Sequence, residues 1–328
     1  MADPEPQPAD PAWLLADIGG TNARFALAGR RTKPHDIRVL SNRDHPDIGR
    51  AAAAYLAQVQ PATPPRMAAF CVACPTDGDE IALTNYGWRF SKSALGAELD
   101  LDRLEVINDF AAVAHCVPYL ADADREQIGG GPAVDGAPIG VIGPGTGLGV
   151  SGLVQVAGHW IALASEGGHV SLAACNTRED AVLQALRQQF GRVSSERAVS
   201  GPGLLNLYWA LCSIDGVAAQ ELTPGDVTAR ALAGDETCSE AARMLSAMLG
   251  TVAGNLALTL GARGGVYVAG GVVGNMGAAF DRALFRARFE DKGRLTDFNN
   301  LIPVFLITAT YPAFLGLAEL LREPADAG

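Results

Sequence analysis

The chain has too few basic residues to bind a polyanion through its overall charge. Its 328 residues contain 25 Lys and Arg against 36 Asp and Glu, which gives a formal net charge of −11. This balance argues against nucleic-acid or anionic-membrane binding that depends on bulk positive charge, although it leaves a local basic patch open. Hydrophobic residues make up 48% and charged residues 19%, so we expect a folded globular protein.

Cysteine is also scarce. Six cysteines in a chain of this length are too few for a disulfide framework, and we therefore expect a reducing, cytosolic environment. Cys71 and Cys74 form a C-x-x-C pair inside an apolar stretch with strand composition. A redox motif of this kind would open a helix, and a zinc site would need a second ligand pair. We therefore interpret both cysteines as buried side chains near a strand end.

Signals for export or membrane insertion are lacking in the same way. Residues 1–10 are acidic and proline-rich, without a basic segment followed by an apolar one. We predict a disordered tail over residues 1–12 and a cytoplasmic protein. The one candidate for a membrane span, Leu245 to Ala262, is interrupted by glycines and polar residues. A buried core helix explains its composition better.

Glycine, by contrast, is abundant: 38 residues are glycine. Two glycine-rich segments resemble each other, ADIGGTNARFAL and IGPGTGLGVSGLV, with Thr21 and Thr146 lying 125 residues apart. Each has the composition of an apolar strand, a Gly-Thr turn and a second strand. The interval is too long for a solenoid repeat and matches the size of a domain. It predicts two similar α/β domains that each offer a glycine hairpin to a shared cleft.

Length and this repeat together predict two domains. We expect a small α/β domain over residues 13–118 and 303–328, and a large α/β domain over residues 119–302, each with a mixed sheet. The apolar segment IPVFLI, residues 302–307, is the last predicted strand. We expect it to join the sheet of the small domain.

The first glycine segment combines groups that suit a nucleotide phosphate. Asp17 ends a predicted strand, and Gly19, Gly20, Thr21 and Asn22 follow it. Adjacent glycines let backbone amides approach phosphate oxygens closely, and an Asp at a strand end can hold Mg²⁺ or its water. A tight hairpin would use the same Gly and Asn residues without any ligand, so the segment alone leaves both interpretations open.

Two later glycine segments allow a similar approach. Gly145, Thr146 and Gly147 lie in GPGTGLG, which lacks the Lys of a Walker A loop. A formal G-x-G-x-x-G match starts at Gly147, but it runs into strand composition, whereas a dinucleotide motif opens a helix. Gly270 and Gly271 follow an apolar strand. They could seat a base or ribose, or could only join the strand to a helix.

Five polar residues lie beside apolar strand ends or glycine turns: Asn108, Asp109, Glu166, His169 and Glu196. Amide, carboxylate and imidazole groups can surround a neutral polyol with hydrogen-bond donors and acceptors. Asp109 could accept a hydroxyl proton, or it could cap the helix that follows. His169 has no second His or Cys at ligand spacing, which argues against a metal site there.

Eight motifs in order resemble the bacterial glucokinase family: LADIGGTNARFAL, TNYGW, INDF, GPGTGLGV, EGGHV, SERAVSGPGL, AGGVV and FEDKGR. The resemblance extends from about Trp13 to Leu321, and its larger group is the hexokinase, actin and heat-shock ATPase superfamily. It implies two ribonuclease-H-like domains, a C-terminal helix that returns to the first domain, and a homodimer. The implied reaction is ATP-dependent phosphorylation of glucose at its 6-hydroxyl.

The resemblance also implies residue roles. Asp109 would be the catalytic base, Asp17 would position Mg²⁺, and Asn85 of TNYGW would support the sugar pocket. Sugar hydroxyls would be held by Asn108, Glu166, His169 and Glu196. ATP phosphates would be held by Gly19, Gly20, Thr21, Asn22, Gly145, Thr146 and Gly147, and the adenosine by Gly270 and Gly271. Pro144 departs from the expected small residue and removes one N–H donor from the second phosphate segment.

Three other functions compete with this one. A kinase for another hexose or an amino sugar would need the same kinds of polar side chains. A sugar-sensing repressor on the same fold would need an added DNA-binding segment, for which the N-terminal ten residues are too short. The cysteine-rich zinc motif of the related repressor and kinase family is absent after EGGH. An actin-like polymer is the remaining alternative.

Overall fold

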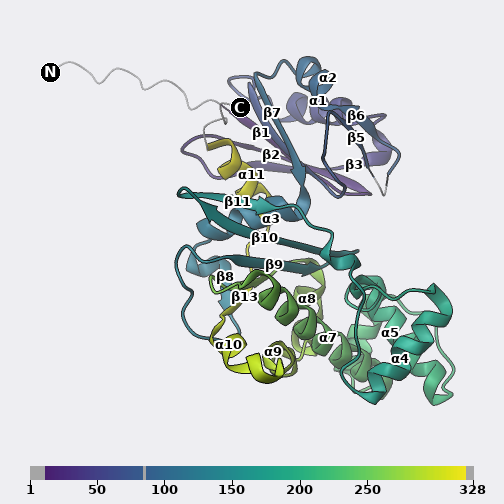
Figure 1. Cartoon of the computed structure of the whole chain (residues 1–328). Helices are drawn as coiled ribbons and strands as arrows, with labels where there is room; N and C mark the ends of the chain where they lie inside the picture. The colour runs from purple at the N-terminus through teal and green to yellow at the C-terminus, as the bar shows by residue number, and fades with distance from the viewer. Residues whose placement is uncertain (1–11, 84–85, 323–328) are drawn as a thin grey trace. The chain divides into compact units, whose positions relative to one another are not determined.

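The computed structural model describes residues 12–83 and 86–322. The chain divides into two compact units (Figure 1). Unit 1 takes the residues up to Leu120 and those from Thr310, and unit 2 is the continuous segment Ala121–Ala309. Except for Ala12, the tail predicted at residues 1–12 lies outside the described residues, and so does Asn85.

Unit 1 is built on a five-stranded mixed sheet in the order β3-β2-β1-β4-β7, with a separate hairpin of β5 and β6. Its strands are β1 (Trp13–Ile18), β2 (Asn22–Ala28), β3 (His35–Ser41), β4 (Met67–Val72), β5 (Glu80–Ala82), β6 (Arg89–Ser91) and β7 (Arg103–Asn108). Its helices are α1 (Ile48–Val59), α2 (Lys92–Glu98), α3 (Asp109–Cys116) and α11 (Pro312–Arg322).

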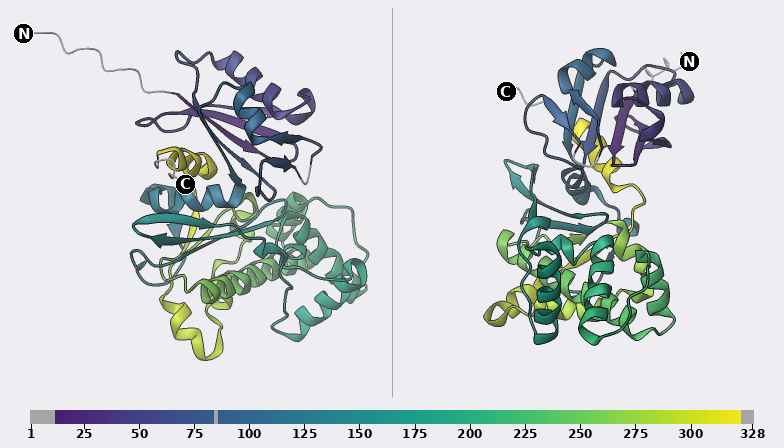
Figure 2. Two further views of the ribbon diagram at one scale, coloured as in Figure 1. Left: turned by 45° about the horizontal axis from the view of Figure 1, so that its top comes forward. Right: turned by 90° about the vertical axis from the view of Figure 1, so that its right-hand side faces the viewer.

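Both faces of this sheet are apolar and covered, because successive side chains of a strand point to opposite faces. Leu14 and Ile18 of β1 lie in the cluster that α1 and α2 complete. Trp13 and Leu15 lie in the cluster that α3 and α11 complete. Figure 2 shows these two helix layers around the sheet. The C-terminal helix α11 thus packs in unit 1, as the resemblance implies.

Unit 2 contains a six-stranded mixed sheet in the order β11-β10-β9-β12-β13-β8. Its strands are β8 (Arg125–Gln127), β9 (Ile139–Pro144), β10 (Leu148–Val156), β11 (His159–Leu163), β12 (Val266–Val268) and β13 (Val304–Ile307). Its helices are α4 (Thr177–Phe190), α5 (Gly201–Asp215), α6 (Pro224–Leu232), α7 (Glu236–Leu260), α8 (Gly271–Met276), α9 (Arg282–Glu290) and α10 (Thr296–Leu301).

The two sheets repeat one topology, as the paired glycine segments predict. In unit 1, β1 pairs antiparallel with β2 and parallel with β4. In unit 2, β9 pairs antiparallel with β10 and parallel with β12. In both units the turn inside the antiparallel pair carries the Gly-Thr sequence. The mixed α/β fold with two similar sheets is therefore confirmed.

The predicted place of the last strand was wrong. β13 pairs parallel with β12 and antiparallel with β8, so it belongs to the sheet of unit 2. Val304, Phe305 and Leu306 are all buried, and a strand that is apolar on both faces carries no alternation to show which sheet receives it. The returning segment of unit 1 begins at Thr310, and its described residues include α11.

The candidate membrane span is a core helix of unit 2. α7 is the one helix of the described residues that is long and apolar enough to cross a membrane, but 78% of its apolar window is buried. Two of its glycines allow α9 to approach closely. A Cβ at Gly250 would lie 2.2 Å from the carbonyl oxygen of Phe285, and one at Gly254 would lie 2.5 Å from that of Phe289. α7 thus packs closely against another helix inside unit 2, as its composition predicts.

Candidate active site

In unit 1, Asp17 is the one partly buried residue of β1, between the buried Ala16 and Ile18. The sheet register places Arg24 of β2 on one side of it and Cys71 of β4 on the other. Arg24 Nη1 donates to Asp17 Oδ2 at 2.9 Å, and Cys71 Sγ donates to Asp17 Oδ1 at 3.7 Å. Both oxygens of the carboxylate are thus held by neighbouring strands.

Asp17 and Asp109 both lie near enough to the buried Cys71 thiol for their charges to act on it. Burial raises the pKa of the Cys71 thiol well above its usual range, and the charges of Asp17 and Asp109 raise it further. The thiol therefore stays protonated and can only donate to Asp17. Cys71 and Cys74 are both buried, as predicted for the C-x-x-C pair.

The turn that follows β1 is pinned by backbone and side-chain hydrogen bonds. The amide of Gly19 donates to the carbonyl of Asn22 at 3.0 Å. Asn42, which follows β3, donates its own amide to Thr21 O at 3.0 Å and its Nδ2 to Gly19 O at 2.9 Å. Thr21 itself is exposed. The turn is therefore a fixed feature of unit 1 with its threonine facing solvent.

Asp109 opens helix α3 directly after β7, but it is not the residue that caps the helix. The cap is Asn108, whose Oδ1 accepts from the amides of Phe110 and Ala111 at 2.9 and 3.3 Å. Asp109 Oδ1 accepts from the amide of Phe110 at 2.9 Å. Asp109 is therefore not the cap of α3. Its carboxylate lies in the first turn of the helix, where the positive end of the helix dipole stabilises a negative charge.

In unit 2, Glu196 is tied to the second glycine segment. Its Oε2 accepts from the amide of Leu148 at 3.0 Å, and a Cβ at Gly147 would lie 2.5 Å from the same oxygen. The amide of Gly145 donates to Gly147 O, and the amide of Gly201 donates to Gly145 O, both at 2.8 Å. The Glu196 carboxylate thus lies against this loop, in the space that a side chain at position 147 would enter.

Glu166 precedes the short 3-10 turn Gly167–His169, which is linked to the segment carrying Glu196. His169 Nε2 lies 3.9 Å from Glu166 Oε2, and both side chains are more than half exposed. Ser171 bridges to Ser194, and the amide of Ser195 donates to Val170 O at 2.8 Å. Unit 2 thus brings the three predicted sugar ligands of this unit onto two adjoining segments.

A cavity of about 870 Å³ opens beside the second glycine segment. Its walls come from the β9–β10 turn, from the first turn of α5, and from α6 and α8 along their length: Gly145, Thr146, Gly201, Pro202, Leu204, Pro224, Gly225, Thr228, Ala229, Leu232, Gly271, Val272, Asn275 and Met276. Its size falls within the usual range for small-molecule sites, and its mixture of apolar side chains with a few polar groups is typical of them. Gly271 lines it directly.

Gly270, which precedes the cavity residue Gly271, allows close packing of two strands. Its φ is +87°, and a Cβ there would lie 2.5 Å from Pro144 O. Only glycine can combine that backbone angle with that contact, so Gly270 lets the end of β12 approach β9. The α6 wall, with Thr228 and Leu232, was not predicted. Its sequence is that of an ordinary amphipathic helix with a Thr223 cap, and no motif distinguishes it.

The groups around the cavity are suited to a nucleotide. They are also compatible with a magnesium ion that is bound mainly by the phosphates of that nucleotide. Helix α5 begins at the cavity with Ser200 as its cap, so its positive end favours an anion. No group of three or more His, Cys, Asp or Glu side chains that could hold a metal occurs in residues 12–83 and 86–322. Mg²⁺ commonly uses one or two carboxylates together with substrate phosphates, and Asp17 supplies one carboxylate.

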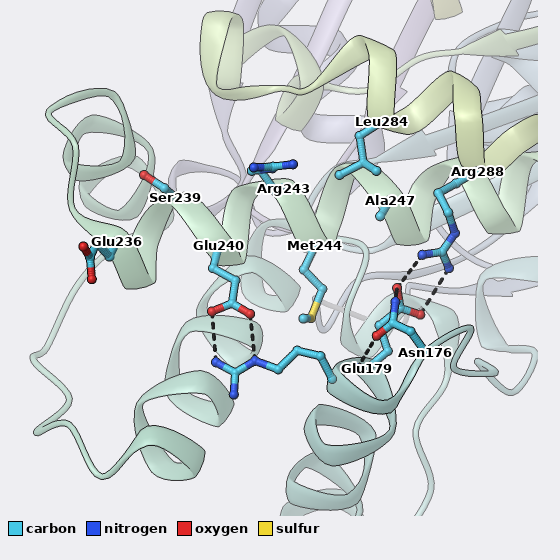
Figure 3. Close-up of a pocket in the computed structure, with 11 residues that line it drawn as sticks. Asn176, Glu179, Glu236, Ser239, Glu240, Arg243, Met244, Ala247, Leu284 and Arg288 are labelled. Atoms are coloured by element: carbon cyan, nitrogen blue, oxygen red, sulfur yellow. Dashed lines mark hydrogen bonds and ion pairs between the residues drawn. The ribbon is translucent and has the colours of Figure 1, made fainter.

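A second cavity, of about 400 Å³, lies among α4, α7 and α9 (Figure 3). Its arginines are already paired with acidic partners. Arg288 binds both oxygens of the buried Glu179 at 2.5 and 3.1 Å. Arg178 bridges Glu240 and Asp215 at 2.6 to 2.9 Å. These ion pairs connect the helices and explain the cavity as part of their packing.

Comparison with known proteins decides the family. The family model described as Glucokinase matches residues 14–324. The chain belongs to the glucokinase family. It is 49% identical to the glucokinase of Nitrobacter hamburgensis, covering 95% of this chain and 97% of that one. It is also 49% identical to the glucokinase of Paramagnetospirillum magneticum, covering 96% and 98%.

A solved structure supports the same assignment at the level of the fold. The crystal structure of glucokinase from an Antarctic psychrotroph aligns with a TM-score of 0.86 at 36% identity, covering 95% of this chain and 98% of that one. The family's actin-like ATPase fold accounts for the two repeated mixed sheets. The resemblance found in the sequence motifs is therefore confirmed.

Proposed function

We propose that this glucokinase family member transfers the γ-phosphoryl group of ATP to the 6-hydroxyl of D-glucose, giving glucose 6-phosphate and ADP. The observation that carries the proposal is the match over nearly the whole length to proteins named glucokinase. The nucleotide-sized cavity and the polar side chains predicted to hold a sugar supply the matching chemistry.

The proposed sugar ligands come from both units. Unit 1 supplies Asn108 and Asp109, and unit 2 supplies Glu166, His169 and Glu196. Asn108 caps α3 through Oδ1 alone, so its Nδ2 would donate to a sugar hydroxyl. Asn85, which lies outside the described residues, remains a predicted support of the same pocket. Carboxylates and imidazole can each bind vicinal hydroxyls through more than one hydrogen bond.

The proposed nucleotide site uses the glycine segments. Adenosine would occupy the cavity beside Gly270 and Gly271, and the phosphates would meet Gly145, Thr146 and Gly147 of unit 2. Residues Gly19, Gly20, Thr21 and Asn22 of unit 1 would bind the terminal phosphates. Asp17 would hold Mg²⁺, which offsets the charge of the phosphates when it is bound. Arg24 and Cys71 fix the orientation of Asp17 for that purpose.

Asp109 is the proposed proton acceptor. The 6-oxygen of glucose forms a bond to the γ-phosphorus while the bond from phosphorus to the leaving oxygen of ADP breaks. The hydroxyl proton passes to the Asp109 carboxylate, which also orients the attacking oxygen. Its place directly after β7, which pairs with β4 in the sheet of unit 1, gives the carboxylate a rigid base, which positioning of this kind requires.

We also propose that the enzyme is cytoplasmic and acts as a homodimer. The acidic composition and the buried apolar helix α7 support the first point, and the family resemblance supports the second. Sedimentation equilibrium over a range of protein concentrations would test the dimer. A single species with the mass of one chain, 34.0 kDa, would contradict it.

A substrate panel tests the reaction and its main alternative. Formation of ADP is followed by a coupled assay at fixed Mg²⁺ and ATP with glucose, mannose, fructose, galactose or glucosamine. We expect the highest kcat/KM with glucose. A higher value with another sugar would favour the second candidate, a kinase for a different hexose or amino sugar. No sugar-dependent turnover of ATP with any of the five would contradict both.

A further inference from the structure

Asn42 is a fully buried polar residue beside the first glycine turn, outside every motif that resembles the family. Its relative exposure is 0%. It follows the edge strand β3 and holds the turn at two points, Gly19 O through its Nδ2 and Thr21 O through its amide. The side chain of Asn42 thus binds the carbonyl of a glycine that lies 23 residues earlier in the sequence. We asked what physical role this buried contact has.

The reason lies in the Gly19–Gly20 peptide. Glycine has no Cβ to restrict its backbone, so the plane of a peptide between two glycines is free to rotate. All peptide bonds of the described residues are trans, and in a trans peptide the carbonyl and the next N–H point in opposite directions. By binding Gly19 O, Asn42 therefore also fixes the direction of the Gly20 N–H, away from Asn42.

The hydrogen bonds of Asn42 are also costly to arrange. Its Oδ1 is buried without a hydrogen-bond partner among the described residues, and a buried acceptor without a partner destabilises the fold. An apolar residue of similar size would avoid that cost but could not donate to Gly19. The geometry therefore favours a specific use for the Nδ2 donor.

We propose that Asn42 is a positioning residue for the terminal phosphates of ATP, acting by holding the Gly20 N–H toward the phosphate oxygens. The proposal rests on the proposed function of the first glycine turn. Asn42 would not touch the nucleotide. It would fix a donor in advance, so that ATP binding does not have to immobilise a rotating Gly-Gly peptide.

Asn42→Ala tests this directly, with Asn42→Ser as a second, less disruptive variant whose hydroxyl is too short to replace the Nδ2 contact. Calorimetric titration with ADP and with adenosine measures phosphate-dependent and phosphate-independent binding separately. We expect both variants to bind ADP about three to ten times more weakly and adenosine within twofold of the unchanged chain. In the coupled assay, KM for ATP rises by a similar factor and KM for glucose stays within twofold.

Asn299 provides a matched control. It is also 0% exposed, its Oδ1 also lacks a partner among the described residues, and its Nδ2 donates to Gly254 O and Phe289 O inside unit 2. Asn299→Ala should lower the melting temperature without changing the ratio of ADP to adenosine affinity. If the Asn42 variants behave in the same way as Asn299→Ala, Asn42 has only a structural role and the proposal is overturned.

Failure of the proposed function would look different. An unchanged chain that binds ADP but phosphorylates no sugar contradicts the kinase activity and leaves the role of Asn42 to be decided by the two titrations. An unchanged chain that binds neither ADP nor a non-hydrolysable ATP analogue better than adenosine shows that the turn does not contact phosphate, which overturns the role proposed for Asn42.

Discussion

At the scale of single residues, the candidate site depends on hydrogen bonds that fix side chains before any ligand arrives. Asp17 is held from both sides by Arg24 and Cys71, and Glu196 is held by the amide of Leu148. Preorganised charges of this kind need no rearrangement during the reaction, which is why they contribute strongly to catalysis. The same rigidity lets individual roles be separated by substitution.

Asp109→Asn is expected to abolish most of the activity while leaving the fold intact. Asn keeps an oxygen that accepts from the amide of Phe110, and the helix cap is Asn108 in any case. A neutral amide cannot take the hydroxyl proton as a carboxylate does, so kcat should fall about 10²- to 10⁴-fold. Steady-state kinetics and a thermal melt would measure the two effects.

Asp47→Asn is the matched control for that substitution. Asp47 caps α1 in the same unit by accepting from the amide of Arg50, and Asn caps helices equally well. Both its activity and its melting temperature should stay unchanged. Near-normal turnover in Asp109→Asn would rule out Asp109 as the base and direct attention to Glu166 and Glu196.

The sequence was informative about residues where an acidic side chain stood at the end of an apolar strand. Asp17 is the fifth residue of β1 and Asp109 follows β7 directly, and the charges of both act on the Cys71 thiol. Asn42 gave no such signal, because an Asn after a strand is an ordinary turn residue. Its contact with Gly19 depends on how β3 pairs with β2, and no local pattern shows that register.

At the scale of elements, close helix packing in unit 2 depends on glycines in α7. Gly250→Ala would place a methyl group against the carbonyl of Phe285 in α9, at a distance of 2.2 Å that cannot be kept. Forcing the two helices apart should lower the free energy of unfolding by about 1–3 kcal/mol, measured by urea denaturation. Gly96→Ala in α2 is the control, because its Cβ would meet nothing closer than 3.9 Å. That variant should be neutral or slightly stabilised.

The ion pair between α4 and α9 should make stability depend on pH. Burial alone would raise the pKa of Glu179, but hydrogen bonds from Arg288 and the amide of Cys175 outweigh it and lower the pKa. Because the pKa of Glu179 is lower in the folded state than in the unfolded state, its ionised carboxylate stabilises the fold at pH values above the unfolded pKa of about 4.3. This contribution is lost as the pH falls through the lower folded value.

Glu179→Gln removes that contribution. At pH 7 it should cost about 3–5 kcal/mol, because Arg288 stays buried without its partner charge. The difference from the unchanged chain should shrink between pH 5 and pH 3, when urea denaturation is repeated at each pH. Glu240→Gln breaks the half-exposed pair with Arg178 and should cost about 0–1 kcal/mol. Equal losses in the two variants would contradict the burial argument.

Elements were predictable where periodicity and turn residues agreed. Both Gly-Thr hairpins and the core character of α7 followed from composition. β13 was assigned to the wrong sheet because a short, wholly apolar strand carries no information about its neighbours. The α6 wall of the cavity was missed for a related reason. Its residues are ordinary for an amphipathic helix, and only the three-dimensional fold brings Thr228 and Leu232 beside Gly271.

At the scale of the whole molecule, the two units differ in how the chain builds them. Unit 2 is one continuous segment, Ala121–Ala309, whereas unit 1 needs the residues up to Leu120 and the segment from Thr310. The sheet face of unit 1 that carries Trp13 and Leu15 is covered by Phe314 and Leu317 of α11. A large apolar surface would be exposed without that helix, and burial of such surface is the main driving force of folding.

Fragments of the chain should therefore behave unequally. Residues 121–309 expressed alone should fold with a cooperative melt, because the segment contains its complete sheet and its own hydrophobic cluster. They should also bind adenosine, since the cavity beside Gly271 is lined by this unit alone, but they should not phosphorylate glucose, because Asp109 is missing.

Residues 13–120 alone should fail to fold, and addition of α11 through a short glycine-serine linker after residue 120 should restore a cooperative melt. Circular dichroism would decide between these outcomes. A stable fold of residues 13–120 without α11 would show that the returning helix is not needed to complete unit 1.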